Sequence, residues 1–197
     1  MIEKLKSAKE ASKVLGITAP SKINKALENI SQELINNIDY ILKANEKDIL
    51  AAQERGISKA MIDRLLLTKD RIESISKDVL KIREINFDVD KVLETFNTKE
   101  GLLIEKVRVP FGVIGAIYEA RPNVSVDIAV LCLKTKNACV LKGGSEALNS
   151  NKAIVEVMHK AIKDILPIGV ITFIDDTNRD KVLELIKAKE YLDLVVP

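Results

Sequence analysis

Residues 110–151, PFGVIGAIYEARPNVSVDIAVLCLKTKNACVLKGGSEALNSN, decide the fold class of this chain. An apolar run ends at Tyr118, a helical stretch follows, and a second apolar run, Asn137–Leu141, opens into Lys142-Gly143-Gly144-Ser145. A strand that leads into glycines and a helix start is how a parallel sheet presents backbone N–H groups to phosphate. The lysine at the end of the strand favours an anionic ligand. The stretch therefore predicts a parallel α/β sheet with a ligand site at the ends of its strands.

The alternation of strand and helix continues to the end of the chain. The runs expected to be strands are short and almost wholly apolar, as in a parallel sheet covered by helices on both faces. They are Gly112–Tyr118, Asn137–Leu141, Gly169–Ile174 and Leu192–Val196, with helices expected near 124–134, 146–165 and 178–187. This βαβαβαβ order predicts right-handed crossovers and a ligand at the carboxyl edge of a Rossmann-like sheet.

The first 86 or so residues show a helical pattern instead. Apolar residues repeat at threes and fours from Ser21 to Lys43, which marks one buried stripe. Asn45, with Asp48 three residues later, predicts the restart of a shorter helix, since a cap residue is followed by an acid in the first turn. Thr68 is expected to cap the next helix.

Residues 89–110 predict a β-hairpin between these two regions. The arms Lys91–Asn97 and Leu102–Val109 lie either side of a turn sequence, Thr98-Lys99-Glu100-Gly101. Apolar and charged residues mix in both arms. A single hairpin is marginally stable alone and needs a partner surface or further strands.

Composition excludes several classes of function. The 31 basic residues nearly cancel the 29 acidic ones, so the net charge of +2 gives no electrostatic footprint for nucleic acid. No apolar run reaches the length of a membrane span, and the first residues lack the apolar core of a signal peptide. Two cysteines without metal-type spacing and a single histidine argue for a reducing, cytoplasmic setting and against a metal site.

Lys142-Gly143-Gly144-Ser145 is the first candidate binding site. The glycines let a ligand approach the backbone, the following helix favours an anion, and Lys142 adds a full positive charge. The same sequence also suits an ordinary strand-to-helix turn, in which serine caps the helix. Neither dinucleotide-binding G-x-G-x-x-G nor a P-loop pattern is present, so the residues alone leave both interpretations open.

Arg121-Pro122-Asn123 is the second candidate, because it follows the first strand of the predicted sheet. The Asn123 amide can donate to a developing oxyanion, and Arg121 can hold a phosphate or carboxylate. Asn123 suits a helix cap equally well. Cys132 and Cys139 lie in apolar runs, where free cysteine usually acts as a small hydrophobe rather than as a nucleophile.

These motifs carry a family resemblance that runs from end to end of the chain. The segments concerned are Ala44–Asp48, Ile62–Leu65, Val109–Gly115, Tyr118–Val124, Leu141–Gly144 and Ser150–Ala153. With them the chain resembles the amino-terminal half of the γ-glutamyl phosphate reductases (glutamate-5-semialdehyde dehydrogenases), a branch of the aldehyde dehydrogenase superfamily. The family reduces γ-glutamyl phosphate to glutamate 5-semialdehyde with NADPH, releasing phosphate, through a cysteine thioester in proline biosynthesis.

The resemblance implies a role for each candidate. Lys142, Gly143, Gly144 and Ser145 would bind the adenosine ribose and 2′-phosphate side of NADP(H). Asn123 would stabilise the oxyanion, and Arg121 would contact the acyl phosphate or carboxylate of the substrate. Residues 1–88 and 111–197 would form the NADP-binding domain, incomplete at its carboxyl end, and 89–110 the oligomerisation hairpin of a homo-oligomer.

The resemblance also implies a catalytic domain with the nucleophilic cysteine beyond this chain, so the chain is expected to be inactive alone. It departs from the family where Lys142 stands in place of a frequent arginine, which keeps the charge but loses a two-pronged phosphate contact. A non-catalytic nucleotide-binding or assembly module on the same scaffold remains the alternative, as does an interaction piece acting through the hairpin.

Overall fold

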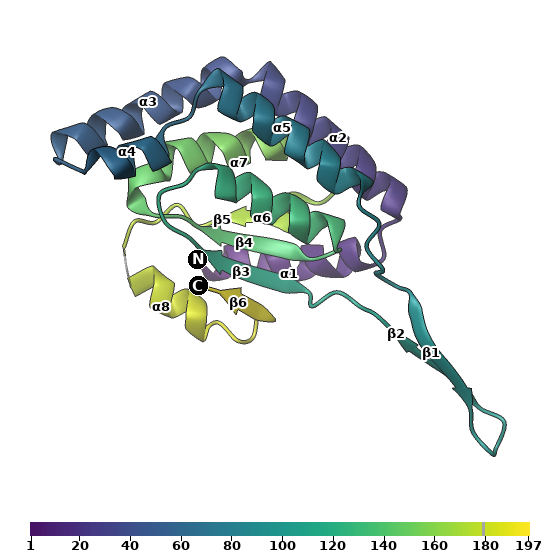
Figure 1. The fold of residues 1–197 in the computed structure, drawn as a ribbon. Coiled ribbons are helices and arrows are strands. Elements are labelled where there is room, and N and C mark those ends of the chain that lie inside the picture. Colours follow the sequence, from purple (N-terminus) through teal and green to yellow (C-terminus); the bar gives the residue numbers. More distant parts are fainter. Residues whose placement is uncertain (179) are drawn as a thin grey trace.

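Four strands build a parallel sheet in the structure, a computed structural model that describes residues 1–178 and 180–197 (Figure 1). They are β3 (Val113–Ile117), β4 (Ala138–Lys142), β5 (Ile171–Phe173) and β6 (Leu194–Val196). Their order across the sheet is β5-β4-β3-β6, and all three pairings are parallel. The chain thus moves from β3 to β5 and then returns to the other side of β3. In parallel sheets, the crevice at such a reversal is where ligands bind.

The direction of each crossover sets the face on which its helix lies. The steps from β3 to β5 run one way, so right-handed connections put α6 (Asn123–Lys134) and α7 (Leu148–Ile162) on one face. The return step to β6 puts α8 (Asp180–Lys187) on the other face, together with α1 (Ile2–Gly16) (Figure 1). Short 3₁₀ turns, η1 (Ser145–Ala147) and η2 (Ile168–Val170), precede α7 and β5. The predicted α/β class with a parallel sheet is confirmed.

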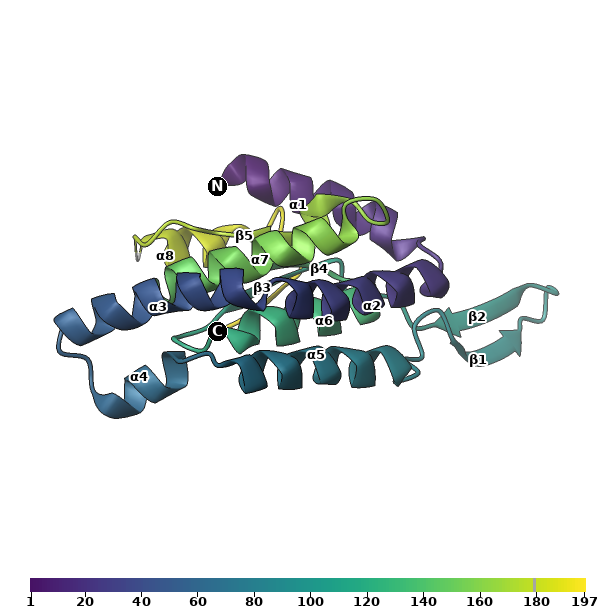
Figure 2. The ribbon, with the colours of Figure 1, turned by 90° about the horizontal axis from the view of Figure 1, so that it is seen from above.

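A further layer of helices covers α6 and α7. It consists of α2 (Pro20–Asn36), α3 (Ile38–Glu54), α4 (Lys59–Leu65) and α5 (Lys69–Glu84). Helix α2 packs against α5, α6 and α7, and α3 packs against α7; Figure 2 shows α2 and α5 running side by side. Because α6 and α7 lie between this layer and the sheet, both are apolar on more than one side.

One expectation for the amino-terminal helices is wrong. The break falls at Asn37, between α2 and α3, and Asn45 and Asp48 lie buried in the interior of α3. Asn45 Nδ2 donates to the Leu65 carbonyl (2.8 Å) and its Oδ1 accepts from Leu67 N (2.8 Å). The Asn45 side chain thus forms hydrogen bonds with a segment about twenty residues away. The sequence alone does not distinguish this role from that of a helix cap. The predicted Thr68 cap of α5 is confirmed.

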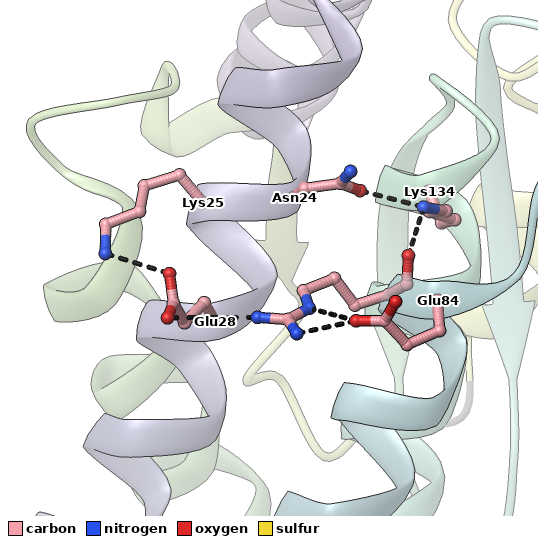
Figure 3. Close-up of polar contacts among 6 residues, drawn as sticks. Asn24, Lys25, Glu28, Glu84 and Lys134 are labelled. Carbon is pink, nitrogen blue, oxygen red and sulfur yellow. Dashed lines mark hydrogen bonds and ion pairs between the residues drawn. The ribbon is translucent and has the colours of Figure 1, made fainter.

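Polar contacts join the ends of α2, α5 and α6 (Figure 3). Lys134 Nζ, in the last turn of α6, donates to Asn24 Oδ1 on α2 (2.8 Å) and to the Arg83 carbonyl at the end of α5. Arg83 in turn pairs with Glu28 and Glu84. Lys134 thereby satisfies one of the carbonyls left without an intrahelical partner at the end of a helix.

The hairpin of β1 (Val92–Asn97) and β2 (Leu103–Val107) stands apart from the sheet. The two strands are antiparallel, with a register shift between Val92 and Glu94, and every residue of both is exposed. Figure 1 shows the hairpin projecting from the body of the molecule. The predicted hairpin is confirmed. In the part of the chain that the structure describes, no helix is long and apolar enough to span a bilayer.

Candidate active site

A cavity of about 310 Å³ lies at the carboxyl ends of β3 and β4. Its lining includes all four predicted cofactor residues, Lys142, Gly143, Gly144 and Ser145, and the segment Ile117–Ala120 that follows β3. Tyr118 N donates to the Lys142 carbonyl (3.1 Å) and Gly144 N to the Glu119 carbonyl (3.3 Å), which joins the two strand ends. The candidate residues thus converge on the edge of the sheet where its topology favours a ligand.

Lys142 is the buried charged residue of this cavity. Its side chain is only 6% exposed, and Nζ donates to the Gly143 carbonyl (3.0 Å). Within residues 1–178 and 180–197, no carboxylate lies within ion-pair distance of this ammonium group. An ammonium carries three donors, and buried charges are normally paired. Two N–H bonds of Lys142 therefore remain for an anionic or hydroxyl-bearing ligand, and the site fits a nucleotide.

Steric contacts also bear on the presence of glycine at positions 143 and 144. A Cβ on Gly143 would lie 2.3 Å from Asn151 Nδ2, and a Cβ on Gly144 would lie 2.7 Å from Glu146 Oε2. Glycine is therefore favoured at 143 by the buried Asn151 side chain, whether or not a ligand approaches the turn, whereas at 144 the flexible Glu146 side chain can move aside. The turn leads into η1, and the side chain of Ser145 donates to Glu146 (3.2 Å) instead of capping the helix. The alternative interpretation of this turn, in which the Ser145 side chain caps the helix, therefore does not hold.

A buried hydrogen-bond chain supports the turn from beneath. Tyr118 Oη and Ser125 Oγ lie 2.6 Å apart, and Ser125 donates to Asn151 Oδ1 (2.9 Å). Burial raises the pKa of Tyr118 well above its ordinary value, so the phenol stays neutral and can donate to Ser125. Asn151 is fully buried, and its Nδ2, next to Gly143, has no partner in the described structure.

Asp48 positions the helix that follows the turn. Its carboxylate accepts from Ser150 N (2.7 Å), Ser150 Oγ (2.6 Å) and Asn149 Nδ2 (2.7 Å) at the start of α7. It therefore caps α7 from α3, about a hundred residues away in the sequence. The capping role of Asp48 is not predicted from the sequence, nor is the position of Glu146 in the lining of the cavity. An acid in the first turn after the glycines was the available signal for Glu146.

Arg121 and Asn123 line a different hollow, of about 360 Å³, against α5 and the segment that precedes it. Arg121 is exposed. Asn123 is the first residue of α6, and its Nδ2 donates to Asp127 Oδ2 (3.0 Å), so it does not act as the cap of that helix. Burial raises the pKa of Asp127, an effect that the hydrogen bond from Asn123 opposes. One hydrogen of the Asn123 amide remains for a ligand. The structure thus keeps these two residues apart from Lys142.

Neither cysteine is among the residues that line the two hollows. Cys139 is fully buried in β4, and both its contact with Cys132 and its burial raise its pKa well above the ordinary value of a thiol. Cys132 is buried in α6. His159 Nε2 lies 2.6 Å from the Ile171 carbonyl. Among the described residues no group of His, Cys, Asp or Glu is arranged to hold a metal ion.

The chain has the same fold as part of an aldehyde dehydrogenase. A probable aldehyde dehydrogenase from Listeria monocytogenes EGD-e superposes with a TM-score of 0.74 over 98% of this chain and 40% of that protein, at 17% identity. No family model matches the sequence. The fold is of the aldehyde dehydrogenase type, as expected.

Closer relatives narrow this class to one group of reductases. Gamma-glutamyl phosphate reductases from Halalkalibacterium halodurans and Histophilus somni are 42% and 46% identical over 199 and 193 residues. The Thermotoga maritima gamma-glutamyl phosphate reductase superposes with a TM-score of 0.97 at 42% identity, over 100% of this chain and 48% of its own. The homologues of the chain are thus γ-glutamyl phosphate reductases, and the resemblance is confirmed. The chain spans 48% and 46% of the two curated relatives, about half their length.

Proposed function

We propose that the chain is the cofactor-binding part of an NADPH-dependent γ-glutamyl phosphate reductase, which forms glutamate 5-semialdehyde and phosphate in proline biosynthesis. The observation that carries the proposal is that Lys142, a buried lysine, lines a cavity at the end of a parallel strand and has no carboxylate partner among the described residues. A charge in this position is costly unless a ligand or a hydrogen bond compensates it. A cytoplasmic location belongs to the same proposal, since the pathway builds an amino acid.

Each candidate cofactor residue of the cavity then has a role in holding the nucleotide. Lys142 donates to the ribose and phosphate oxygens of the adenosine half, and the Gly143-Gly144 turn lets these atoms approach the backbone. Ser145 adds a hydroxyl at the rim. NADPH, when bound, supplies the hydride. The chain of Tyr118, Ser125 and Asn151 keeps the turn in place from the protein side.

The second hollow is proposed as the substrate side. Arg121 holds the acyl phosphate or the carboxylate of the glutamyl group, which suits an exposed guanidinium at the carboxyl edge of the sheet. Asn123 donates its remaining amide hydrogen to the oxyanion that forms on the substrate carbonyl. Because both cysteines of this chain are buried, we expect no turnover from the chain alone.

The hairpin at 89–110 is proposed as the oligomerisation arm. Its exposed apolar side chains include Phe96, Leu103, Ile104 and Val107. Pairing with another copy would bury them and stabilise two strands that are marginal alone.

Calorimetric titration with NADPH tests the cofactor site. The Lys142→Met variant keeps the unbranched, apolar part of the buried side chain and removes its charge, so affinity should fall by about 1–2 kcal/mol, typical of one charge-assisted hydrogen bond. Lys152→Met, on the exposed surface of α7, is the matched control and should bind like wild type. Equal affinity in all three proteins would remove Lys142 from the cofactor site.

A further inference from the structure

The hollow of about 360 Å³ beside Arg121 carries charges of both signs. Its lining includes a second arginine, Arg64, and the carboxylate of Asp78 on α5. Neither Arg64 nor Arg121 forms an ion pair in the part of the chain that the structure describes. The remaining charged groups of the lining, Arg71 and Asp63, pair with each other (3.0 Å). The hollow thus offers two arginines and a carboxylate to a ligand that itself carries both signs of charge.

A second carboxylate, Asp127, lies one turn along α6 from Asn123. Its Oδ2 accepts from Asn123 Nδ2 (3.0 Å), and it forms no ion pair with any other described residue. Burial raises the pKa of Asp127, the hydrogen bond from Asn123 lowers it, and the negative charge of Asp78 raises it again. Asp78 pairs with Lys81 on its own helix (2.8 Å), an exposed contact of the kind that contributes little. Two carboxylates therefore lie near each other where α5 packs against α6, and a bound cation would favour the ionised form of both.

We infer that Asp127 and Asp78 bind the α-ammonium group of the glutamyl substrate and so select an α-amino acid over a plain dicarboxylate. The inference rests on the proposed function, since it needs the substrate carbonyl at Asn123. In γ-glutamyl phosphate, four bonds of about 1.5 Å each separate the carbonyl carbon from the α-nitrogen, which gives a reach of roughly 5 Å. One turn of an α-helix rises by about 5.4 Å. A substrate with its carbonyl at Asn123 can therefore bring its ammonium group to the level of Asp127.

The two arginines suit the anionic groups of the same molecule. A guanidinium can give two parallel N–H bonds to one carboxylate or phosphate. Arg64 is therefore suited to the α-carboxylate when Arg121 holds the acyl phosphate. Each charged group of the substrate then meets the opposite charge. A ligand without the ammonium group leaves both carboxylates uncompensated, and a site rejects an analogue that leaves its polar groups unpaired.

Two small probes isolate this contact. L-Glutamate and glutarate have the same carbon chain and the same two carboxylates, and they differ only in the α-ammonium group. In NMR titrations of the 197-residue chain, L-glutamate should bind at least fivefold more tightly than glutarate and should shift the side-chain amide signals of Asn123. Asp127→Asn keeps an oxygen that can accept from Asn123 but removes the charge, so it should reduce this preference, as should Asp78→Asn. The double variant should bind both probes alike.

Asp70→Asn is the matched control, because Asp70 is an exposed acid of α5 that does not line the hollow. It should keep the preference of wild type for L-glutamate. Thermal melting followed by circular dichroism should show that all variants are folded at the temperature of the titrations. If wild type binds both probes equally, or if the double variant keeps the preference, the role of the two carboxylates is refuted while the hollow stands as the substrate side. If wild type binds neither probe, the substrate side itself fails, and the inference fails with it.

Discussion

Removing the Asp48 carboxylate should destabilise the chain more than any other single change of an acidic residue on α3. The side chain is 4% exposed and accepts hydrogen bonds from Asn149 and Ser150 at the start of α7. In Asp48→Ala, the exposed donors of Asn149 can form hydrogen bonds with water instead. Ser150 is fully buried, so its N–H and hydroxyl lose their acceptor and find no other.

The magnitude follows from these contacts. Loss of a side-chain cap costs about 1 kcal/mol, and a buried donor without a partner costs roughly 1–3 kcal/mol. Asp48→Ala should therefore lower the free energy of unfolding by about 3 kcal/mol. Asp48→Asn, which keeps one oxygen for Ser150, should lose roughly half of that amount.

Urea unfolding followed by circular dichroism measures both values, and an unchanged slope against urea excludes a change in the unfolded chain. Glu46→Ala, an exposed acid on the same helix, is the control and should stay within about 0.5 kcal/mol of wild type. If Asp48→Ala proves as mild as Glu46→Ala, the capping of α7 by α3 does not stabilise the fold, and the reasoning is refuted.

Three further expectations concern the packing, pH and thiol chemistry of the chain. Gly143→Ala should lower the free energy of unfolding by about 1–3 kcal/mol, because its Cβ meets Asn151 Nδ2. In a double-mutant cycle with Asn151→Ala, most of this loss should be relieved. Additive losses would contradict the clash. Burial raises the pKa of Asp193, but hydrogen bonds from Lys9 and the Val113 N–H outweigh it, so the net pKa lies below the ordinary value. The ionised group therefore stabilises the fold above about pH 4, and this contribution is lost as pH falls further. Asp193→Asn should accordingly be less stable than wild type by about 1 kcal/mol at neutral pH, a difference that should shrink in urea titrations as pH falls below about 4. Both buried cysteines should react with a thiol reagent such as DTNB only after unfolding, and rapid labelling of the native chain would show an opening of the core.

The parallel sheet was predictable because the apolar pattern of each strand segment matches its burial in the folded chain. Strands such as Ala138–Lys142 are buried on both faces, so an unbroken apolar run is their sequence signature. The glycine turn after this strand and the Thr68 cap are likewise local features, visible within a few residues. The candidate cofactor residues could therefore be named before the structure.

Long-range polar contacts explain why the roles of Asn45 and Asp48 were not predicted from the sequence. Asn45 and Asp48 sit inside a helix with partners from Leu65 to Ser150, and no spacing rule joins positions so distant. Nor could the sequence show that the Lys142 ammonium is buried, or that Arg121 and Lys142 face different hollows. These properties depend on how layers stack, which the order of helices and strands leaves open.

The position of α1 has a consequence for the synthesis of the protein on the ribosome. This helix is translated before the sheet that it covers, and its contacts Lys4–Asp175 and Lys9–Asp193 join residues 171 and 184 positions apart. At typical rates of synthesis, roughly 10–35 seconds separate the two members of each pair. Until β4 and β5, the strands that it contacts most, have been made, the apolar side of α1, with Leu5, Ala8 and Leu15, has no complete sheet to cover. The nascent chain thus offers a transient hydrophobic helix near its start, a natural target for a chaperone.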